Sequence, residues 1–254
     1  MITNSYSASC YIENNDGEYH IKCDMGTDKG DFHSQYDGKD FVFGDLEYAL
    51  YNLLELGIGQ VYIVVGKEGD LIKNILGNHY KELEIFYVVQ QEQKGLIDAF
   101  YQAINIIGYD SPVVLQLSDE VFIDFKADEI KKLLKADLYD FYCGITYEDN
   151  PDKIKNNFSV KSDDNGLIKE CIEKPVEIIN NIKGTGCCIF NSESLQILKD
   201  KNADEESLIY DLCDYINYLV KNDKKGLALH LAEKEFNVNT FADLLEVQIY
   251  LDAD

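Results

Sequence analysis

Two patterns of hydrophobic positions alternate along this chain of 254 residues. In residues 45–56 and 96–107 the apolar side chains recur every three or four positions, which predicts amphipathic helices. Residues 60–66 and 84–89 are instead short, nearly continuous apolar runs, which are typical of strands buried on both faces. Strands that alternate with helices in this way predict an α/β fold built on a parallel sheet.

The same patterns extend to both ends of the chain. Residues 8–13 and 18–23 flank Asn14-Asn15-Asp16-Gly17, a strong turn signal, and predict a hairpin. Only three prolines occur and no low-complexity linker is present, so we expect one domain over residues 1–254. The other expected strands are 113–117, 141–147, 158–161, 167–172, 185–190 and 227–231, and the other expected helices are 70–76, 192–199, 205–220 and 241–251.

Charge and cysteine content narrow the classes of function. The 47 Asp and Glu exceed the 23 positive residues, all of them Lys, and the net charge is −24. Such a surface repels phosphate backbones, so we expect no binding to nucleic acid. No apolar run approaches the ~18 residues of a membrane span, and the first residues lack the pattern of a signal peptide. With seven Cys and no C-x-x-C, we expect buried thiols and a reducing, cytoplasmic location.

The loop after the strand at 84–89 carries candidate ligand-binding residues. Gln90 and Gln91 follow the strand, and Gly95 and Leu96 open the next helix. In an open α/β sheet this corner lies at the carboxyl edge of the strands, where ligands bind. An amide can pair with a base edge through one donor and one acceptor, and a glycine lets the backbone approach a ligand closely. An ordinary strand-to-helix turn would have the same pattern.

Two further segments place charged residues at strand ends. The strand at 113–117 is followed by Ser118, Asp119 and Glu120, and a carboxylate there suits a divalent cation that carries a phosphate. The strand at 167–172 ends in Glu173 and Lys174, whose side chains point to opposite sides of an extended chain, so one can bind sugar hydroxyls and the other a phosphate. Exposed, solvated charges would give both patterns as well.

The order and spacing of these segments resemble the sugar-1-phosphate nucleotidylyltransferases, of the glucose-1-phosphate thymidylyl- and uridylyltransferase kind. The family's patterns Q-x-x-x-x-G-L/T-A-x-A, L-G-D-N, E-K-P and T-G-x-x-x-F correspond to the segments around Gln90, Asp119, Lys174 and Gly186, and residues 236–244 resemble W-x-D-I-N-T-P-E-D-L. The resemblance covers about residue 38 to the C-terminus. It implies a single-domain, Rossmann-like nucleotide-diphospho-sugar transferase fold, with a mainly parallel mixed sheet flanked by helices.

The resemblance also implies roles for individual residues. Asp119 and Lys174 would be catalytic, and Asp119, Asn237 and Asn239 would bind Mg²⁺. The substrates would be a nucleoside triphosphate and a sugar 1-phosphate, or a nucleotide sugar. The residues that would bind them are Gln90, Gln91, Gly95, Leu96, Glu173 and Gly186.

The family's N-terminal signature, G-G-x-G-T-R followed by P-K-P, is missing. Residues 1–37 hold the predicted hairpin and a polar loop, with neither Arg nor Pro. The signature binds a triphosphate through backbone N–H groups, and its Arg and Lys offset charge on the departing pyrophosphate. The segment 26–30 with Lys29 is the candidate substitute, although the Asp residues of this loop would repel a phosphate and favour a plain surface loop. Asn237 stands at the second metal Asp, and Ser159 stands at a Gly that contacts the sugar.

Three functions are therefore open. The first is a divergent transferase that makes a nucleotide sugar and pyrophosphate. The second is a catalytically deficient homologue that binds a sugar phosphate or nucleotide sugar as a regulatory or assembly subunit, and the missing Arg favours it. The third is a glycosyltransferase of related fold, which the lack of a clear D-x-D disfavours. The predicted hairpin offers a strand edge for pairing with a second copy, so a homo-oligomer is also open.

Overall fold

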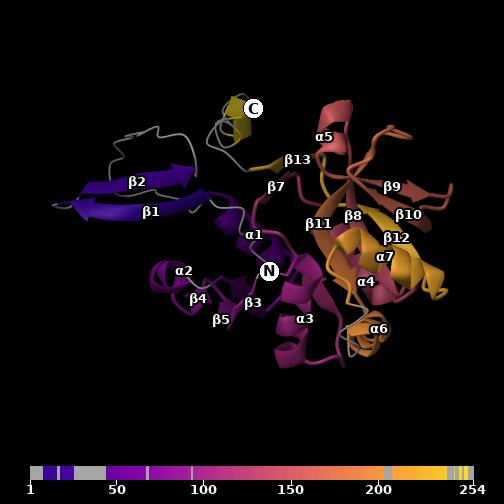
Figure 1. Cartoon of the computed structure of the whole chain (residues 1–254), viewed down its shortest axis with the longest axis horizontal. Helices are drawn as coiled ribbons and strands as arrows, with labels where there is room; N and C mark the ends of the chain where they lie inside the picture. Colours follow the sequence, from indigo (N-terminus) through magenta and orange to yellow (C-terminus); the bar gives the residue numbers. More distant parts are fainter. Residues whose placement is uncertain are drawn as a thin grey trace.

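The computed structural model describes residues 8–15, 18–25, 44–66, 69–92, 94–202 and 208–238, together with 243, 246, 247, 249 and 250 (Figure 1). The helices are α1 (Gly44–Glu55), α2 (Asp70–Leu76), α3 (Leu96–Ile107), α4 (Ala127–Ala136), α5 (Pro151–Lys155), α6 (Ser192–Asn202) and α7 (Leu212–Lys221). The strands are β1 (Ala8–Asn15), β2 (Glu18–Met25), β3 (Gln60–Val65), β4 (His79–Tyr80), β5 (Leu83–Val89), β6 (Val113–Leu115), β7 (Glu120–Ile123), β8 (Phe141–Tyr147), β9 (Phe158–Ser162), β10 (Ile168–Glu173), β11 (Ile182–Phe190), β12 (Gly226–His230) and β13 (Lys234–Asn237).

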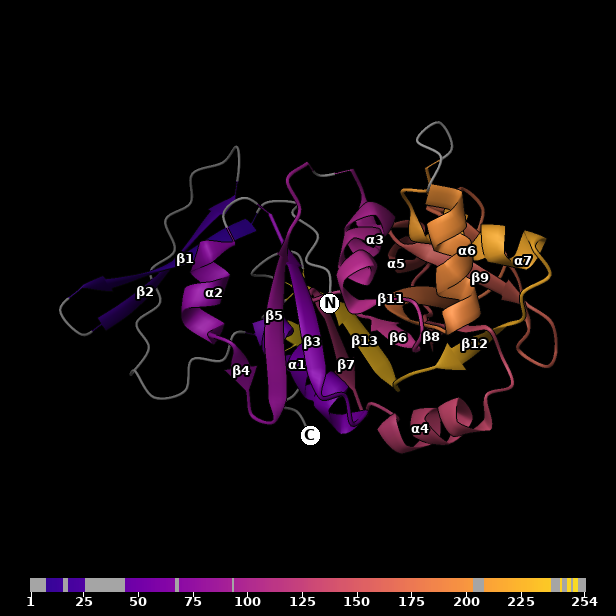
Figure 2. The same cartoon turned by 90° about the horizontal axis from the view of Figure 1, so that it is seen from below.

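Among the described residues the strands form four hydrogen-bonded sheets, with the orders β1–β2, β3–β5–β4, β7–β13 and β10–β9–β11–β8–β12, and β6 pairs with β11 in the last of these. Successive side chains of each strand point to opposite faces. On β3, Ile63 packs toward α1, whereas Val64 joins the core under α3. On β11, Cys188 packs on the α3, α6 and α7 side, and Ile189 packs against α4. In Figure 2, α3 and α6 lie above the strands and α4 lies below them. The sheet is therefore covered on both faces, as the buried strand pattern predicts.

The strand pairing confirms a mixed α/β fold, but much of the pairing is antiparallel. β3 pairs with β5 in parallel, and so do β8 and β12. The other ladders, including β11 with β6, β8 and β9, are antiparallel. The described sheet is thus less parallel than expected, because the strands of its second half reverse direction through short connections such as the turn at 163–166.

Most of the predicted elements are present. The hairpin β1–β2 forms, with Cys10 opposite Cys23 in its register, and the described residues between 241 and 251 are helical. The helix expected at 205–220 is wrong at its start, because it begins at Leu212 after the non-helical residues 208–211. In that segment the Tyr210 carbonyl accepts the Ile97 N–H of α3 at 2.9 Å instead of continuing a helix. The sequence patterns did not predict α4, α5, β4, β7 or β13.

An irregularity in β11 shapes the centre of the molecule. Its register against β8 shifts between Gly184 and Cys188. Within the shift, the Gly186 N–H donates to both carboxylate oxygens of Glu120, at 2.7 and 2.9 Å, and the Gly186 carbonyl accepts the Leu117 N–H. A Cβ on Gly186 would lie 2.3 Å from the Leu117 side chain, so only glycine fits there.

Strands β7 and β13 form a two-stranded ribbon, of which one face is apolar and the other holds two buried carboxylates beside the apolar Phe122. Val121 and Phe236 are register partners and pack with Val247. The alternation of side chains places Glu120 and Glu235 on the opposite face, which lies toward β11. Both carboxylates are nearly inaccessible to solvent, at 2% and 4% exposure.

No helix in the described part of the chain is long and apolar enough to cross a membrane.

We expect Glu120→Gln to stabilise the protein at alkaline pH. Burial raises the pKa of Glu120 well above the ordinary value of 4.5, the Glu235 and Asp119 carboxylates add to this, and the Gly186 N–H and Lys183 oppose it. A raised pKa means that the carboxyl group favours folding when it is protonated and loses that contribution as the pH rises. Gln keeps an acceptor for Gly186 without the charge.

Urea denaturation at about pH 8 and about pH 5 measures this effect. The free energy of unfolding of Glu120→Gln should exceed the wild-type value at the higher pH, and the excess should shrink at the lower pH. Glu120→Leu, which leaves the Gly186 N–H without its acceptor, should be less stable than Glu120→Gln by about 1–3 kcal/mol. A Gln variant that is less stable than wild type at the higher pH would contradict the account.

A second pH dependence arises at His230 on β12. Its ring packs edge-on against Tyr147 with the centroids 5.0 Å apart, and its Nδ1 lies 3.1 Å from the Lys126 ammonium. Burial, and then Lys126, lower the pKa of His230 from 6.5. The unfolded chain therefore binds this proton at a higher pH than the folded protein does. The contribution of the neutral His230 ring to stability is present above pH 6.5 and is lost as the pH falls through the lower pKa of the folded state. His230→Gln should have a shallower decline of melting temperature below neutral pH, and an unchanged decline would rule out this assignment.

Candidate functional site

The backbones of two predicted metal ligands lie side by side at the open end of the β7–β13 ribbon. Asp119 lies in the turn before β7, and its carbonyl accepts the Val238 N–H at 2.6 Å. Asn237, next to Val238, is the register partner of Glu120. Residues far apart in the sequence are thus held side by side. Asn239, the third predicted ligand, and the segment 26–30 with Lys29 lie outside the described residues.

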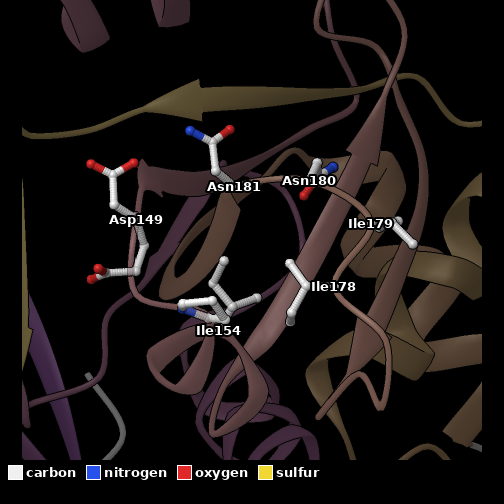
Figure 3. Close-up of a pocket in the computed structure, with 8 residues that line it drawn as sticks. Asp149, Ile154, Ile178, Ile179, Asn180 and Asn181 are labelled. Atoms are coloured by element: carbon white, nitrogen blue, oxygen red, sulfur yellow. The ribbon is translucent and has the colours of Figure 1, made fainter.

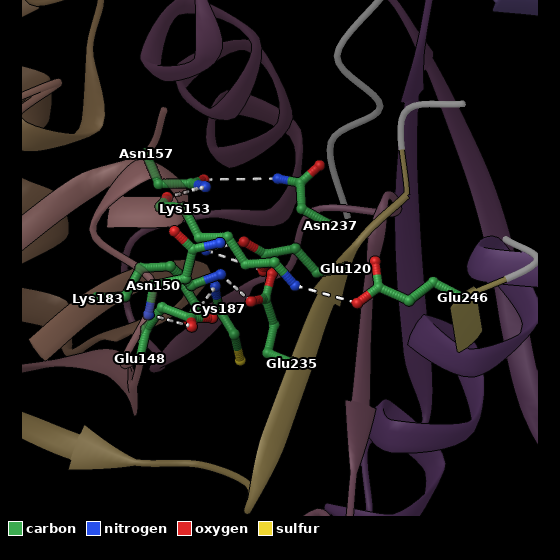
Figure 4. Close-up of polar contacts among 12 residues, drawn as sticks. Glu120, Glu148, Asn150, Lys153, Asn157, Lys183, Cys187, Glu235, Asn237 and Glu246 are labelled. Atoms are coloured by element: carbon green, nitrogen blue, oxygen red, sulfur yellow. Dashed lines mark hydrogen bonds and ion pairs between the residues drawn. The ribbon is translucent and has the colours of Figure 1, made fainter. Parts of the chain in front are cut away.

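Behind this turn lies a buried ion pair that the sequence patterns did not reveal. The Lys183 ammonium of β11 donates to the Glu235 carboxylate of β13, and the two side chains are 3% and 1% exposed. Figure 4 shows the two side chains pointing toward one another, with Glu120 and Asn237 nearby. Because Lys and Glu are rarely buried without a partner, neither residue type would be assigned to the interior from sequence alone.

The E-K-P turn presents its lysine to solvent. Lys174 has φ +42°, in the left-handed region, so the chain is not extended there. The expected opposite orientation of Glu173 and Lys174 is therefore wrong: the Lys174 ammonium lies 4.0 Å from the Glu173 carboxylate. The Lys174 side chain is 70% exposed, which leaves it able to contact a bound anion. The left-handed conformation of Lys174 changes the direction of the chain after β10. It thereby brings the charges of Glu173 and Lys174 to the same side.

Glu173 is partly buried on its other side. The Cys213 thiol of α7 lies 3.5 Å from the Glu173 carboxylate and donates to it. Burial raises the pKa of Glu173, and the Cys213 hydrogen bond opposes this shift. The carboxylate is thus oriented from the protein side, and half of it remains exposed.

Asn157 links the two halves of the candidate site. Its carbonyl accepts the Lys174 N–H at 2.8 Å, and its amide oxygen lies 3.5 Å from the Asn237 amide nitrogen (Figure 4). The Asn157 amide group also donates to the Lys153 carbonyl at 3.1 Å. One residue therefore connects the E-K-P turn, through its backbone carbonyl, with the strand that ends beside Asp119, through its side chain. No sequence pattern marks Asn157, because the contact depends on long-range strand register.

The two candidate base-binding amides differ in accessibility. Gln90 is 9% exposed, and its amide donates to the Asp98 carboxylate of α3 at 2.8 Å. Gln91 is exposed at the carboxyl end of β5. Gln90 therefore attaches the loop to α3, and Gln91 is the amide left accessible to a ligand.

Gly95 and Leu96 open α3 beside the segment that precedes α7. Gly95 has φ +111°, and a Cβ there would lie 2.8 Å from the Tyr210 carbonyl oxygen. Leu96 is half-buried and packs against the central core. Glycine is thus required at position 95 because the chain there lies close to the protein's own backbone at Tyr210.

The residues expected around the sugar are partly committed to internal contacts. The backbone groups of Gly186 bond to Glu120 and Leu117, as described above. Ser159 is fully buried, and its hydroxyl donates to the Asn180 amide oxygen at 3.0 Å. The space beside the Gly186 Cα is filled by the Leu117 side chain.

A hollow of about 300 Å³ lies beside α5 (Figure 3). It is lined on one side by Glu148, Asp149, Pro151 and Ile154, and on the other by residues 178–181. Its lining includes none of the residues that the sequence predicts for the site. We therefore place the candidate site at the converging polar groups around Asp119 rather than in this hollow.

The donors present near Asp119 suit Mg²⁺. A carboxylate from Asp119 and an amide oxygen from Asn237 are hard oxygen ligands, and Mg²⁺ is commonly held by one or two carboxylates together with water and substrate phosphates. Within the described residues no group of three or more His, Cys, Asp and Glu side chains could hold a metal ion by itself. The site therefore fits a cation that arrives with a nucleotide better than a permanently resident one.

The sequence profile of the nucleotidyl transferase family matches residues 41–249. A low-salt glycan biosynthesis nucleotidyltransferase of Haloferax volcanii is 31% identical over 151 residues, which cover 58% of this chain and 40% of that protein. A UTP–glucose-1-phosphate uridylyltransferase of the same organism is 26% identical over 193 residues, covering 75% of this chain and 74% of that protein.

Solved structures agree with the fold. A UDP-glucose pyrophosphorylase in complex with UDP-glucose superposes with a TM-score of 0.68 at 18% identity, over 82% of this chain and 86% of that chain. A structure described as a glucose-1-phosphate thymidylyltransferase from Bacillus anthracis, in complex with a sucrose, gives a TM-score of 0.69 at 19% identity, over 81% of each chain. These likenesses, together with the profile match over most of the sequence, show that the chain belongs to the nucleotidyl transferase family and resembles its sugar-1-phosphate members.

Proposed function

We propose that this protein transfers a nucleotidyl group from a nucleoside triphosphate to a sugar 1-phosphate, releasing pyrophosphate. We further propose that residues 1–254 act as one transferase domain, with residues 1–37 in place of the family's N-terminal signature. The observation that carries the proposal is the connection from Asp119 through Val238 and Asn237 to Asn157 and Lys174. It supports a site in which a cation-binding carboxylate and an exposed lysine act on one pair of substrates.

In the proposed reaction an oxygen of the sugar 1-phosphate attacks the α-phosphorus of the triphosphate. The new P–O bond forms as the bond from the α-phosphorus to the bridging oxygen of the β-phosphate breaks, and that electron pair leaves on pyrophosphate. Mg²⁺ bound with the nucleotide would offset negative charge on the phosphates. The protein's contribution is mainly positioning and electrostatics.

Five of the predicted residues have a task that their surroundings support. Asp119 would hold the cation, with Asn237 as an amide ligand beside it. Lys174 would bind the attacking phosphate, since its ammonium is exposed and its backbone is fixed by Asn157. Glu173 would accept sugar hydroxyls, and Gln91 would read the base from the end of β5.

A second candidate function is a binding subunit without catalysis. It is favoured by the absence of any Arg from the chain, because nucleotidyl transfer benefits from cations at the leaving pyrophosphate. Such a protein would hold a sugar phosphate or nucleotide sugar with Lys174 and Glu173 and would regulate or assemble with another protein.

Phosphorus NMR of the full chain with Mg²⁺, pooled nucleoside triphosphates and pooled sugar 1-phosphates separates the candidates. Catalysis would produce a diphosphate pair of signals from a nucleotide sugar together with pyrophosphate. Broadening of the sugar phosphate signals without turnover would favour the binding subunit. If the spectra show no turnover and no broadening, both functions are contradicted.

We expect Lys174→Gln to lower the rate of pyrophosphate formation by about 10²–10³-fold, because removal of one donor that stabilises developing charge has an effect of this size. Asp119→Asn should lower the rate and raise the Mg²⁺ concentration needed for half-maximal activity. Asp128 and Lys131 form an exposed ion pair on α4 and supply matched controls. Asp128→Asn and Lys131→Gln should leave the rate unchanged, and equal losses in the control variants would contradict the assigned roles.

A further inference from the structure

The Lys183–Glu235 ion pair joins two separate parts of the sheet. Among the described strands β13 pairs with β7 alone, whereas β11 pairs with β6, β8 and β9. The face of the ribbon that lies toward β11 holds Glu120, which accepts the Gly186 N–H, and Glu235, which pairs with Lys183. On the same face Phe122 packs in one apolar cluster with Cys187 and Ile189 of β11. The ribbon that carries Asn237, and that follows Asp119, is thus attached to the main sheet through two buried carboxylates together with apolar packing.

Stability alone does not account for this pair. A buried ion pair gives up the hydration of both charges, and its replacement by apolar residues of similar volume is often neutral or stabilising. Within the described part of the chain, the second carboxylate oxygen of Glu235, Oε1, is buried without a hydrogen-bond partner. A buried polar atom without a partner is unfavourable and calls for an explanation such as a role in function.

Lys183 also supplies a positive charge where acidic groups gather. The carboxylates of Glu235 and Asp119 are close enough to Glu120 to raise its pKa, and the Lys183 ammonium lowers it. A fixed cation behind the turn lowers the repulsion between these carboxylates. It thereby allows Asp119 and Asn237 to be held together at one edge of the cluster.

We propose that Lys183 and Glu235 form a positioning pair, which fixes the β7–β13 ribbon against β11 and so sets how Asp119 and Asn237 present their oxygens to a divalent cation bound with a nucleotide. This inference rests on the proposed function only in that it requires a cation–nucleotide complex at Asp119. It does not require turnover. Neither residue is placed in contact with substrate.

The test measures binding of Mn²⁺ together with a nucleoside triphosphate, by electron paramagnetic resonance of the free ion. The double variant Lys183→Met/Glu235→Leu removes both charges and keeps apolar volume. Changes to residues behind metal ligands commonly weaken metal affinity by about 10–100-fold, and we expect a loss of this size. The control is Lys126→Met/Glu233→Leu, which removes a partly exposed ion pair with an N–O distance of 2.6 Å and should bind as wild type does.

Urea denaturation and near-ultraviolet circular dichroism should show that the double variant is folded, with an unfolding midpoint close to wild type. If the double variant does not fold, Glu235→Gln is tested instead. Its amide oxygen can still accept from Lys183, so this variant should fold. It should bind the complex more weakly. A folded variant of either kind with wild-type Mn²⁺–nucleotide affinity would overturn the positioning role alone. A wild-type protein that binds no Mn²⁺–nucleotide would overturn this role and the proposed function together, whereas binding without turnover would overturn only the function.

Discussion

The attachment of the β7–β13 ribbon to β11 is the constraint on which the candidate site depends. Two buried carboxylates contribute to it: Glu120 accepts the Gly186 N–H, and Glu235 pairs with Lys183. A buried charge without a partner is strongly unfavourable. In the register that makes both contacts, Asn237 lies beside the Asp119 turn.

The apolar layers hold this polar centre in place. Core residues of β3, β5, β8 and β11 pack against α1 and α4 on one face and against α3, α6 and α7 on the other. The apolar face of the ribbon, with Val121 and Phe236, packs with Val247 near the C-terminal end of the chain. A rigid frame of this kind keeps ligand-binding side chains in fixed geometry, which suits chemistry that relies on positioning.

Local patterns in the sequence predicted α1, α3, β3 and β5, because hydrophobic periodicity depends on neighbours within a few residues. They also led to the predicted roles of Asp119, Asn237 and Lys174, through a family resemblance that the profile match supports. The contacts that join those residues were not predictable in the same way. Lys183–Glu235 and Asn157–Asn237 depend on strand register between distant segments, and the left-handed turn at Lys174 depends on its packing. For the segment 118–120 an exposed acidic turn was one of two open interpretations, yet Glu120 is buried and bonds to the Gly186 N–H, which lies far along the chain.

The central claim is that the Asp119 turn binds a cation together with a nucleotide. Anomalous diffraction from crystals grown with Mn²⁺ and a nucleoside triphosphate tests it most directly, because it locates the ion independently of activity. The account predicts an ion within bonding distance of the Asp119 carboxylate and next to Asn237, in contact with the nucleotide phosphates. An ion and nucleotide bound elsewhere, such as in the hollow beside α5, with the Asp119 turn empty, would contradict it.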